Sequence, residues 1–105
     1  MFGIFKNMFA PTDGSQLKEA VKNGAFLVDV RTPAEFLGGS VKGAVNIPLD
    51  KVPSQLCKFK NKKSIVVFCR SGNRSSQAKS ILKNNGFQNV INGGTWENVN
   101  GAVNE

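Results

Sequence analysis

The feature that most constrains this chain is an apolar run at residues 65–68 that stops at a cysteine. Three of its four side chains are β-branched, which is typical of a strand buried on both faces. Cys69 follows the run, and a polar loop containing Gly72 comes next. From residue 75 apolar residues recur at helical spacing until Gly86, the expected helix end. The sequence therefore predicts a buried strand, a tight loop and a helix, with Cys69 at the strand end.

The loop after Cys69 has the composition of an anion-binding site. Its backbone N–H groups can form a concave nest, and the helix N-terminus adds partial positive charge. Arg70 and Arg74 flank the loop and are two of only three arginines in the chain. Both would favour the thiolate form of Cys69 and hold an anionic substrate. A buried structural cysteine is the alternative, but these neighbours favour a reactive thiol.

The chain contains no histidine, which limits the chemistry open to its cysteines. A cysteine–histidine nucleophile pair is excluded, so the loop itself must activate Cys69. The second cysteine, Cys57, is not at metal-ligand spacing from it, and we expect no metal and no other cofactor. Cys57 falls in a helix expected over 50–59, where we interpret it as a buried filler rather than a resolving thiol.

Apolar and helical segments alternate along the chain. This order predicts an α/β domain with a parallel sheet covered by helices on both faces. Ligands of such folds bind beyond the carboxyl ends of the strands, so Asp29–Arg31, Cys69 and Asn92–Gly94 are expected to converge there. Strands are expected at residues 26–30, 45–47, 65–68 and 89–91, and helices from a cap at Asp13 to Gly24, after Thr32, and over 50–59 and 75–85.

Two acidic residues near the first strand have structural explanations. An unpaired buried carboxylate is very unfavourable, so Asp29 must be paired, and Arg31 or a nearby turn is the expected partner. We prefer a bracing role for Asp29 over a catalytic one. Thr32 and Glu35 form a capping box with Pro33 at the first helical position, which explains Glu35 without chemistry.

The loop Cys69-Arg70-Ser71-Gly72-Asn73-Arg74, followed by Ser75, closely resembles the active-site loop of single-domain rhodaneses, in the thiosulfate sulfurtransferase superfamily. The family commonly has a histidine where Ser40 stands. Trp96 is expected to pack beside the pocket, but it lies closer to the double glycine than is usual in the family. The sequence therefore does not define the last helix. Further resemblance, covering about residues 12 to 100 in all, comes from Leu27–Arg31, Glu35–Pro48 and Val90–Trp96.

The resemblance implies a rhodanese-like three-layer domain with a central, mainly parallel sheet of five strands. It also implies double displacement, in which Cys69 takes the outer sulfur of thiosulfate as a persulfide and releases sulfite. A thiophilic acceptor such as cyanide or a thiol would then remove the sulfur. The substrate-binding residues would be Arg70, Ser71, Gly72, Asn73, Arg74 and Ser75, with Asp29 and Arg31 in support.

Two other functions remain as alternatives. Rhodaneses share their fold with certain cell-cycle phosphatases and arsenate reductases, whose loops place one more residue between the cysteine and an arginine. Only four residues separate Cys69 from Arg74, which favours sulfur over phosphate. The other alternative is a non-catalytic rhodanese-like binding module, but such modules often lack the cysteine that this chain retains.

Length and composition set the remaining expectations. The 105 residues make one domain over 11–100, which follows an apolar N-terminal segment, 1–10, and precedes a C-terminal tail, 101–105. The stretch from residue 98 to residue 105 is expected to be frayed. The N-terminal aromatic residues are expected to pack onto the domain rather than to touch a partner or membrane surface. No apolar run approaches a membrane span, so we expect no stable membrane insertion and a cytoplasmic protein.

The net charge of +7 raises the question of nucleic-acid binding. Eleven of the fourteen cations are lysines spread along the whole chain, which is typical of a solvated surface rather than a binding patch. The excess charge favours the approach of small anions. We therefore expect a monomer whose partners are a small anionic sulfur donor and a thiol or cyanide acceptor, without nucleic acid.

Overall fold

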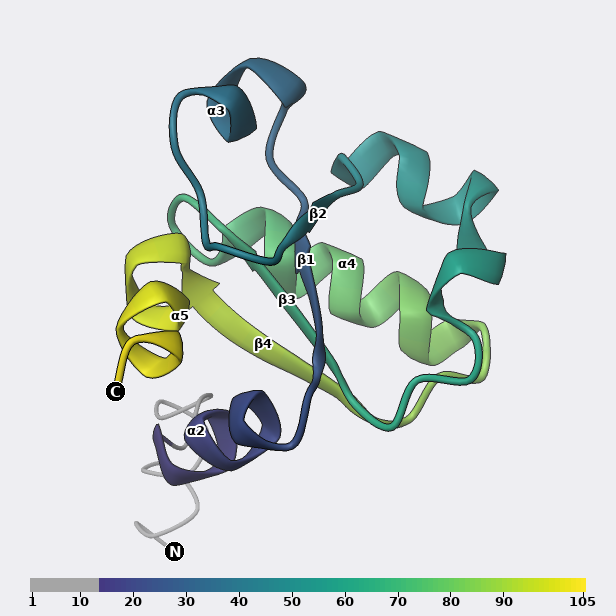
Figure 1. The fold of residues 1–105 in the computed structure, drawn as a ribbon. Coiled ribbons are helices and arrows are strands. Elements are labelled where there is room, and N and C mark those ends of the chain that lie inside the picture. Colours follow the sequence, from purple (N-terminus) through teal and green to yellow (C-terminus); the bar gives the residue numbers. More distant parts are fainter. Residues whose placement is uncertain (1–13) are drawn as a thin grey trace, which may run out of the picture.

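The structure is a computed structural model that describes residues 14–105. The N-terminal segment 1–10 and the helix cap at Asp13 lie outside the described residues. Figure 1 shows a twisted sheet with α4 on one face and with α2 and α5 on the other. The elements are α2 (Gly14–Lys22), β1 (Phe26–Asp29), α3 (Pro33–Leu37), β2 (Val45–Asn46), the 3-10 helices η1 (Leu49–Ser54) and η2 (Leu56–Phe59), β3 (Ile65–Cys69), α4 (Asn73–Asn84), β4 (Val90–Thr95) and α5 (Trp96–Val103).

The sheet has the order β2-β1-β3-β4, and all of its neighbouring strands are parallel. The predicted α/β class, with a parallel sheet between helical layers, is therefore confirmed. The described residues form four strands, which are the four that the apolar segments predict, rather than the five that the family resemblance implied. β3 is central because it pairs with β1 on one side and with β4 on the other.

Side chains of β3 alternate between two hydrophobic cores. Ile65, Val67 and Cys69 point into the core that α4, η1 and η2 cover. Val66 and Phe68 point into the core that α2 and α5 cover. All five are fully buried, which explains the apolar run of the sequence: a strand between two helical layers has no solvent face.

β4 contains a bulge beside the end of β3. Val67 pairs with Asn92 and Phe68 pairs with Gly94, so Gly93 is an extra residue in the ladder. A Cβ atom at Gly93 would lie 2.5 Å from Cγ2 of Val99. Only glycine fits here, and the bulge turns the residues that follow toward the loop after Cys69.

The expected helix over 50–59 is wrong. The segment forms η1 and η2, which are separated by Gln55 with a φ of −125°. Pro53 within η1 has no N–H group, so a continuous α-helix would lose a hydrogen bond there. Phe59 is buried instead of Cys57, whose side chain is exposed, and the prediction of a buried Cys57 is therefore also wrong.

The expectation of a frayed tail from residue 98 is wrong as well. Thr95 caps α5 by accepting a hydrogen bond from the N–H group of Asn98 at 3.1 Å. Val99 is fully buried against the sheet, and α5 continues to Val103. In residues 14–105 we find no helix with the length and hydrophobicity to cross a membrane.

The helix after the cysteine loop begins earlier than the apolar pattern indicates. α4 starts at Asn73, two residues before the expected start at Ser75. Its end agrees with the prediction, because Gly86 has a φ of 93° and the N–H group of Phe87 returns to the carbonyl of Leu82. The early start places the N-terminus of the helix directly at the loop.

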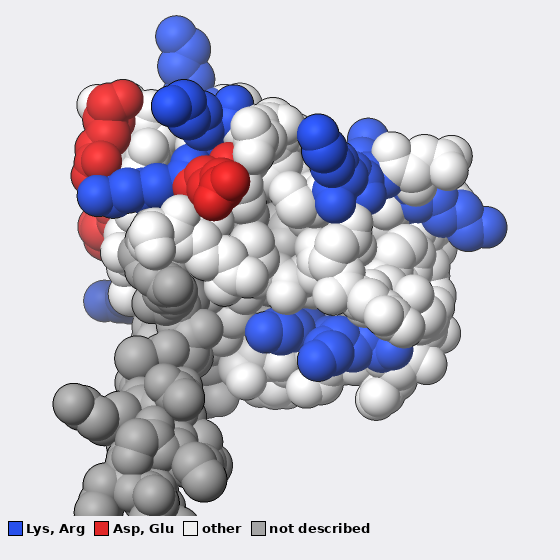
Figure 2. All heavy atoms as spheres, turned by 90° about the horizontal axis from the view of Figure 1, so that it is seen from below, with Lys and Arg blue, Asp and Glu red and all other residues white. Residues whose placement is uncertain are grey.

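Positive charge is not gathered into one surface on the face drawn in Figure 2. Lys and Arg side chains form separate groups there, divided by uncharged surface, and acidic residues cluster near one edge of the view. Nucleic-acid sites usually place their cations along a stripe or one patch. This face does not have that pattern.

Candidate active site

The carboxyl ends of three strands meet at one edge of the sheet (Figure 1). β3 ends at Cys69, which lies opposite Thr95 of β4, and Asp29 at the end of β1 lies opposite Phe68. The stretches that the sequence predicts to converge thus lie side by side. Cys69 and Asp29 are both fully buried, so access to this edge depends on the loops that follow the strands.

Hydrogen-bond donors of the next loop surround Cys69. The N–H group of Gly72 lies 2.9 Å from the sulfur, and the N–H group of Ser75 lies 3.4 Å from it. The Ser75 hydroxyl oxygen is 3.5 Å from the sulfur. Gly72 has a φ of 96°, which favours glycine, and any side chain there would meet the backbone of Gly94. The loop is a nest of amides with the thiol at its base.

The surroundings of Cys69 act on its pKa in opposite directions. Burial raises the pKa of the thiol, because charge is less stable away from water. A hydrogen bond with the Ser75 hydroxyl and hydrogen bonds from the N–H groups of Ser75, Gly72 and Ser71 lower the pKa. The hydrogen bonds prevail, so the pKa of Cys69 lies below its ordinary value and the thiolate form is more accessible than in an unperturbed cysteine.

The two arginines of the loop differ in their surroundings. Arg70 and the nearby Asn73 are exposed. Arg74 is partly buried, and its guanidinium group donates to both carboxylate oxygens of Glu35, at 2.7 and 3.0 Å. Hydrogen bonding to Glu35 raises the pKa of Arg74, and the charge of Cys69 adds to that rise. Arg74 therefore lies within electrostatic range of the sulfur while it is paired with Glu35.

Glu35 has a second contact that sequence reasoning missed. The predicted capping box is present, since Thr32 and Glu35 exchange hydrogen bonds of 3.0 and 3.2 Å. The carboxylate that completes this box also accepts the hydrogen bonds of Arg74, and Arg74 followed by Thr32 lowers the pKa of Glu35 to about 2. No local pattern could have indicated the pair, because 39 positions separate the two residues.

Asp29 and Arg31 form a buried brace beneath the site. Arg31 donates from Nε to Oδ1 of Asp29 at 2.9 Å and from Nη2 to Oδ2 at 2.7 Å. Ser40, at the position where the family commonly has histidine, donates to Oδ2 of Asp29 at 2.7 Å. The guanidinium group lies 5.2 Å from the centre of the Trp96 ring. These contacts fit the bracing role that we preferred for Asp29.

Asn92, which the sequence placed at this edge of the sheet without a role, contacts a residue of the cysteine loop. Its Oδ1 atom accepts hydrogen bonds from the Ser75 hydroxyl at 2.7 Å and from the N–H group of Gly94 at 2.9 Å. An asparagine before two glycines indicates a turn, but not which side chain it meets. Asn92 pairs with Val67 immediately before the bulge at Gly93.

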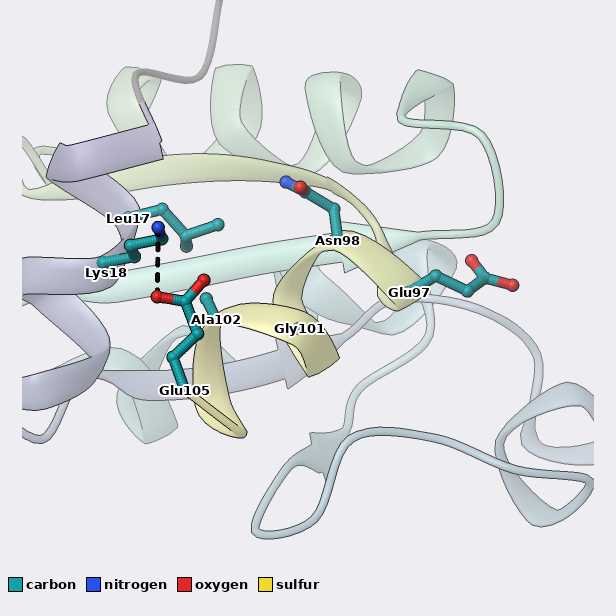
Figure 3. Close-up of a pocket in the computed structure, with 7 residues that line it drawn as sticks. All are labelled: Leu17, Lys18, Glu97, Asn98, Gly101, Ala102 and Glu105. Carbon is teal, nitrogen blue, oxygen red and sulfur yellow. Dashed lines mark ion pairs between the residues drawn. The ribbon is translucent and has the colours of Figure 1, made fainter.

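The cavity in Figure 3 is separate from this site. It has a volume of about 210 Å³ and lies between α2 and α5. Lys18 and Glu105 form an ion pair of 3.0 Å beside it, and both side chains are more than half exposed. Among the described residues, no three His, Cys, Asp or Glu side chains gather where they could hold a metal ion.

Comparisons with known proteins agree with this geometry. The profile of the rhodanese-like domain matches residues 13–97. A sulfurtransferase of Allochromatium vinosum is 38% identical over 66 residues, or 63% of this chain and 62% of that protein. The thiosulfate sulfurtransferase PspE of Escherichia coli is 35% identical over 74 residues, or 69% of this chain and 71% of that protein.

A solved structure described as a rhodanese with anions from E. coli has a TM-score of 0.66 and 34% identity. The alignment covers 71% of this chain and 91% of that one. The chain spans 45% to 62% of the length of three of the curated relatives that it matches. With the matching profile over most of the chain and the strand-end cysteine loop, this protein belongs to the rhodanese-like domain family.

Proposed function

We propose that this protein is a sulfurtransferase that carries a sulfane sulfur on Cys69. The observation behind the proposal is the donor set around the sulfur, with the N–H groups of Gly72 and Ser75 at 2.9 and 3.4 Å. Amides fixed around a buried sulfur stabilise negative charge there, as an oxyanion hole does for oxygen. Both the thiolate and the persulfide carry such a charge.

Thiosulfate is the donor that we propose for the first step. The Cys69 thiolate attacks the outer sulfur, a new S–S bond forms, and the old S–S bond breaks. The electron pair of the broken bond leaves with sulfite, and the negative charge of the persulfide stays in the nest. Family membership and the name of the E. coli relative, a thiosulfate sulfurtransferase, support this donor.

A thiophilic acceptor completes the cycle. Cyanide or a thiolate attacks the outer sulfur of the persulfide, and the electron pair of the broken S–S bond returns to Cys69. The amides of the nest stabilise the thiolate that leaves, as they stabilised the thiolate that attacked. No metal or organic cofactor enters either step.

We propose that Arg70 and Arg74 supply the positive charge for the anionic donor. Arg70 is exposed at the loop, where it can meet the sulfonate end of thiosulfate. Arg74 acts on the donor through its charge while it is paired with Glu35. The scattered cations of Figure 2 support small anions as ligands rather than nucleic acid. We further propose a reduced, cytoplasmic setting, because the thiol must stay reactive. We also propose that the protein is a monomer.

Intact-protein mass spectrometry after incubation with thiosulfate tests the proposal. Wild type and Cys69→Ser are compared, with Cys57→Ser as the matched control because Cys57 is exposed and can react on its own. We expect wild type and Cys57→Ser to gain one sulfur atom that cyanide removes, and Cys69→Ser to gain none. An adduct that persists in Cys69→Ser, or no adduct on any variant, contradicts the proposal.

The same variants separate the alternatives. A phosphatase or arsenate reductase would release phosphate from an aryl phosphate or reduce arsenate, with loss in Cys69→Ser. A binding module would do neither and would form no adduct with any sulfur donor. Only the sulfurtransferase combines a removable sulfur on Cys69 with formation of thiocyanate from cyanide.

A further inference from the structure

We propose that Asn92 is a positioning residue that controls where the Ser75 hydroxyl proton points and, through it, the charge state of Cys69. This inference deepens the proposed function, because Cys69 is the thiol that would carry the sulfur. The ionisation of that thiol can be measured without any sulfur donor, so the two proposals can fail independently.

The orientation of the Asn92 side chain is fixed by the backbone. The N–H group of Gly94 is a donor, so the Asn92 atom that lies 2.9 Å from it must be the carbonyl oxygen Oδ1. The Ser75 hydroxyl lies 2.7 Å from the same oxygen. Because Oδ1 can only accept, Ser75 must be the donor in this short hydrogen bond.

The Ser75 hydroxyl has one proton and three neighbours that could receive it. Oδ1 of Asn92 lies at 2.7 Å, the carbonyl oxygen of Gly72 at 3.0 Å, and the sulfur of Cys69 at 3.5 Å. While the proton points at Asn92 or Gly72, the hydroxyl oxygen offers Cys69 a lone pair and can accept only from a thiol S–H group. This arrangement favours the protonated thiol.

Formation of the thiolate requires the hydroxyl group to turn. A thiolate has no proton to donate, so Ser75 must redirect its own proton to the sulfur and leave Oδ1 of Asn92 with Gly94 alone. Ser75 is fully buried, so bulk water does not replace the lost partner. Asn92 therefore competes with the Cys69 thiolate for the single hydroxyl proton of Ser75. This competition opposes the amides of the nest, which favour the thiolate.

Substitution of Asn92 by alanine changes no charge in the surroundings. β4 itself, Val90–Thr95, has no titratable side chain. The effect of the substitution on Cys69 must then run through Ser75 or through the shape of the bulge, and an experiment can separate these two routes. The charged groups on the elements around the end of β3 are Asp29, Arg31, Glu35, Asp50, Lys51, Arg70, Arg74, Lys79, Lys83 and Glu97.

The rate of alkylation by iodoacetamide across a pH series tests the inference. All variants carry Cys57→Ser, because the exposed Cys57 would otherwise react as well. We expect Asn92→Ala to lower the midpoint of the profile by about half a unit to one unit, since the freed hydroxyl then donates to the thiolate. Thiolate nucleophilicity falls with pKa, so the midpoint and not the plateau rate is the readout.

A double-mutant cycle with Ser75→Ala decides whether Asn92 acts through Ser75. We expect Ser75→Ala to raise the midpoint, and Asn92→Ala to have no further effect in that background. The matched control is Asn98→Ala, because Asn98 donates to the carbonyl of Gly93 at 2.8 Å and braces the same bulge from α5. We expect this control to leave the midpoint unchanged.

Three outcomes overturn the inference. One is no shift in Asn92→Ala, another is an equal shift with and without Ser75, and the third is an equal shift in Asn98→Ala. If circular dichroism shows that Asn92→Ala does not fold, Asn92→Asp replaces it, because Asp keeps the acceptor geometry. Asp should then raise the midpoint, and by less when Ser75 is absent; an equal rise in both backgrounds overturns the inference.

Discussion

Arg74 and Glu35 form a two-armed ion pair, with Nη1 to Oε1 at 2.7 Å and Nη2 to Oε2 at 3.0 Å. The pair joins the first turn of α4 to α3 beside the cysteine loop. An arginine expected to hold the substrate thus has its charge offset by a carboxylate in the resting protein. A bidentate geometry of this kind fixes orientation as well as charge.

Removal of the Glu35 charge is predicted to strengthen the reaction with an anionic donor. Glutamine keeps the capping box but no longer neutralises Arg74. We expect Glu35→Gln to raise kcat/KM for thiosulfate about threefold at low salt, with a smaller gain at high salt. Glu97→Gln is the matched control, because it changes the net charge equally at an exposed position of α5. An equal gain in the control would attribute the effect to general charge, against a specific role of the pair.

The same pair predicts how stability changes at acid pH. The folded-state pKa of Glu35 is about 2, below its ordinary value of 4.5, so the pair stabilises the fold fully above pH 4.5. This contribution is lost as the pH falls toward 2. Because the Arg74 and Glu35 side chains are 32% and 29% exposed, we expect at most about 1 kcal/mol.

Urea unfolding of wild type and Glu35→Gln across this pH range measures that contribution. Other carboxylates titrate equally in both proteins, so their effect cancels in the difference. The difference should be constant above pH 4.5 and disappear near pH 2. A difference that grows on acidification would contradict the assignment.

Loss of the buried brace is predicted to destabilise the protein strongly. Asp29→Asn leaves the Arg31 charge, which is 5% exposed, without its partner. We expect a loss of about 3–5 kcal/mol in the free energy of unfolding. Ser40→Ala removes only one hydrogen bond to the same carboxylate and should cost about 1–2 kcal/mol. Urea denaturation of both variants measures the two losses in the free energy of unfolding. A larger loss in Ser40→Ala than in Asp29→Asn would refute the prediction.

The bulge in β4 is predicted to tolerate no side chain at Gly93. A Cβ atom there would lie 2.5 Å from Cγ2 of Val99 and 3.0 Å from Cγ1 of Val66. We expect Gly93→Ala to cost about 1–3 kcal/mol, because the contact overpacks the core between β4 and α5. Thermal unfolding measures this loss.

Two further variants test the cause of that loss. Gly101→Ala is the control, since a Cβ atom at this helical position meets nothing within 4 Å; it should stabilise by about 0.5–1 kcal/mol. Truncation at Val99 removes the clash, so Val99→Ala should destabilise less in the Gly93→Ala background than in wild type. Strict additivity of the two losses would argue against a steric cause.

Local sequence patterns were sufficient to predict an element when the residues of that segment alone indicate its structure. The run at residues 65–68 predicted β3, the Thr32–Glu35 box predicted α3, and Gly86 predicted the end of α4. The patterns failed where one residue changes the hydrogen bonding or the burial of residues close to it in sequence. Residues 49–59 form two 3-10 helices because Pro53 interrupts the α-helical hydrogen bonds, and burial of Phe59 leaves Cys57 exposed.

The sequence by itself determined the parallel α/β fold and the loop that surrounds Cys69. Both follow from short-range properties: buried strands are uniformly apolar, and a glycine-containing loop before a helix exposes its amides. Tertiary structure alone decided which side chains complete the site. Glu35 reaches Arg74, and Asn92 reaches Ser75, only because parallel strands bring their carboxyl ends to one edge. Side chains 17 and 39 positions apart in sequence thus become hydrogen-bond partners, and no local periodicity records such a distance.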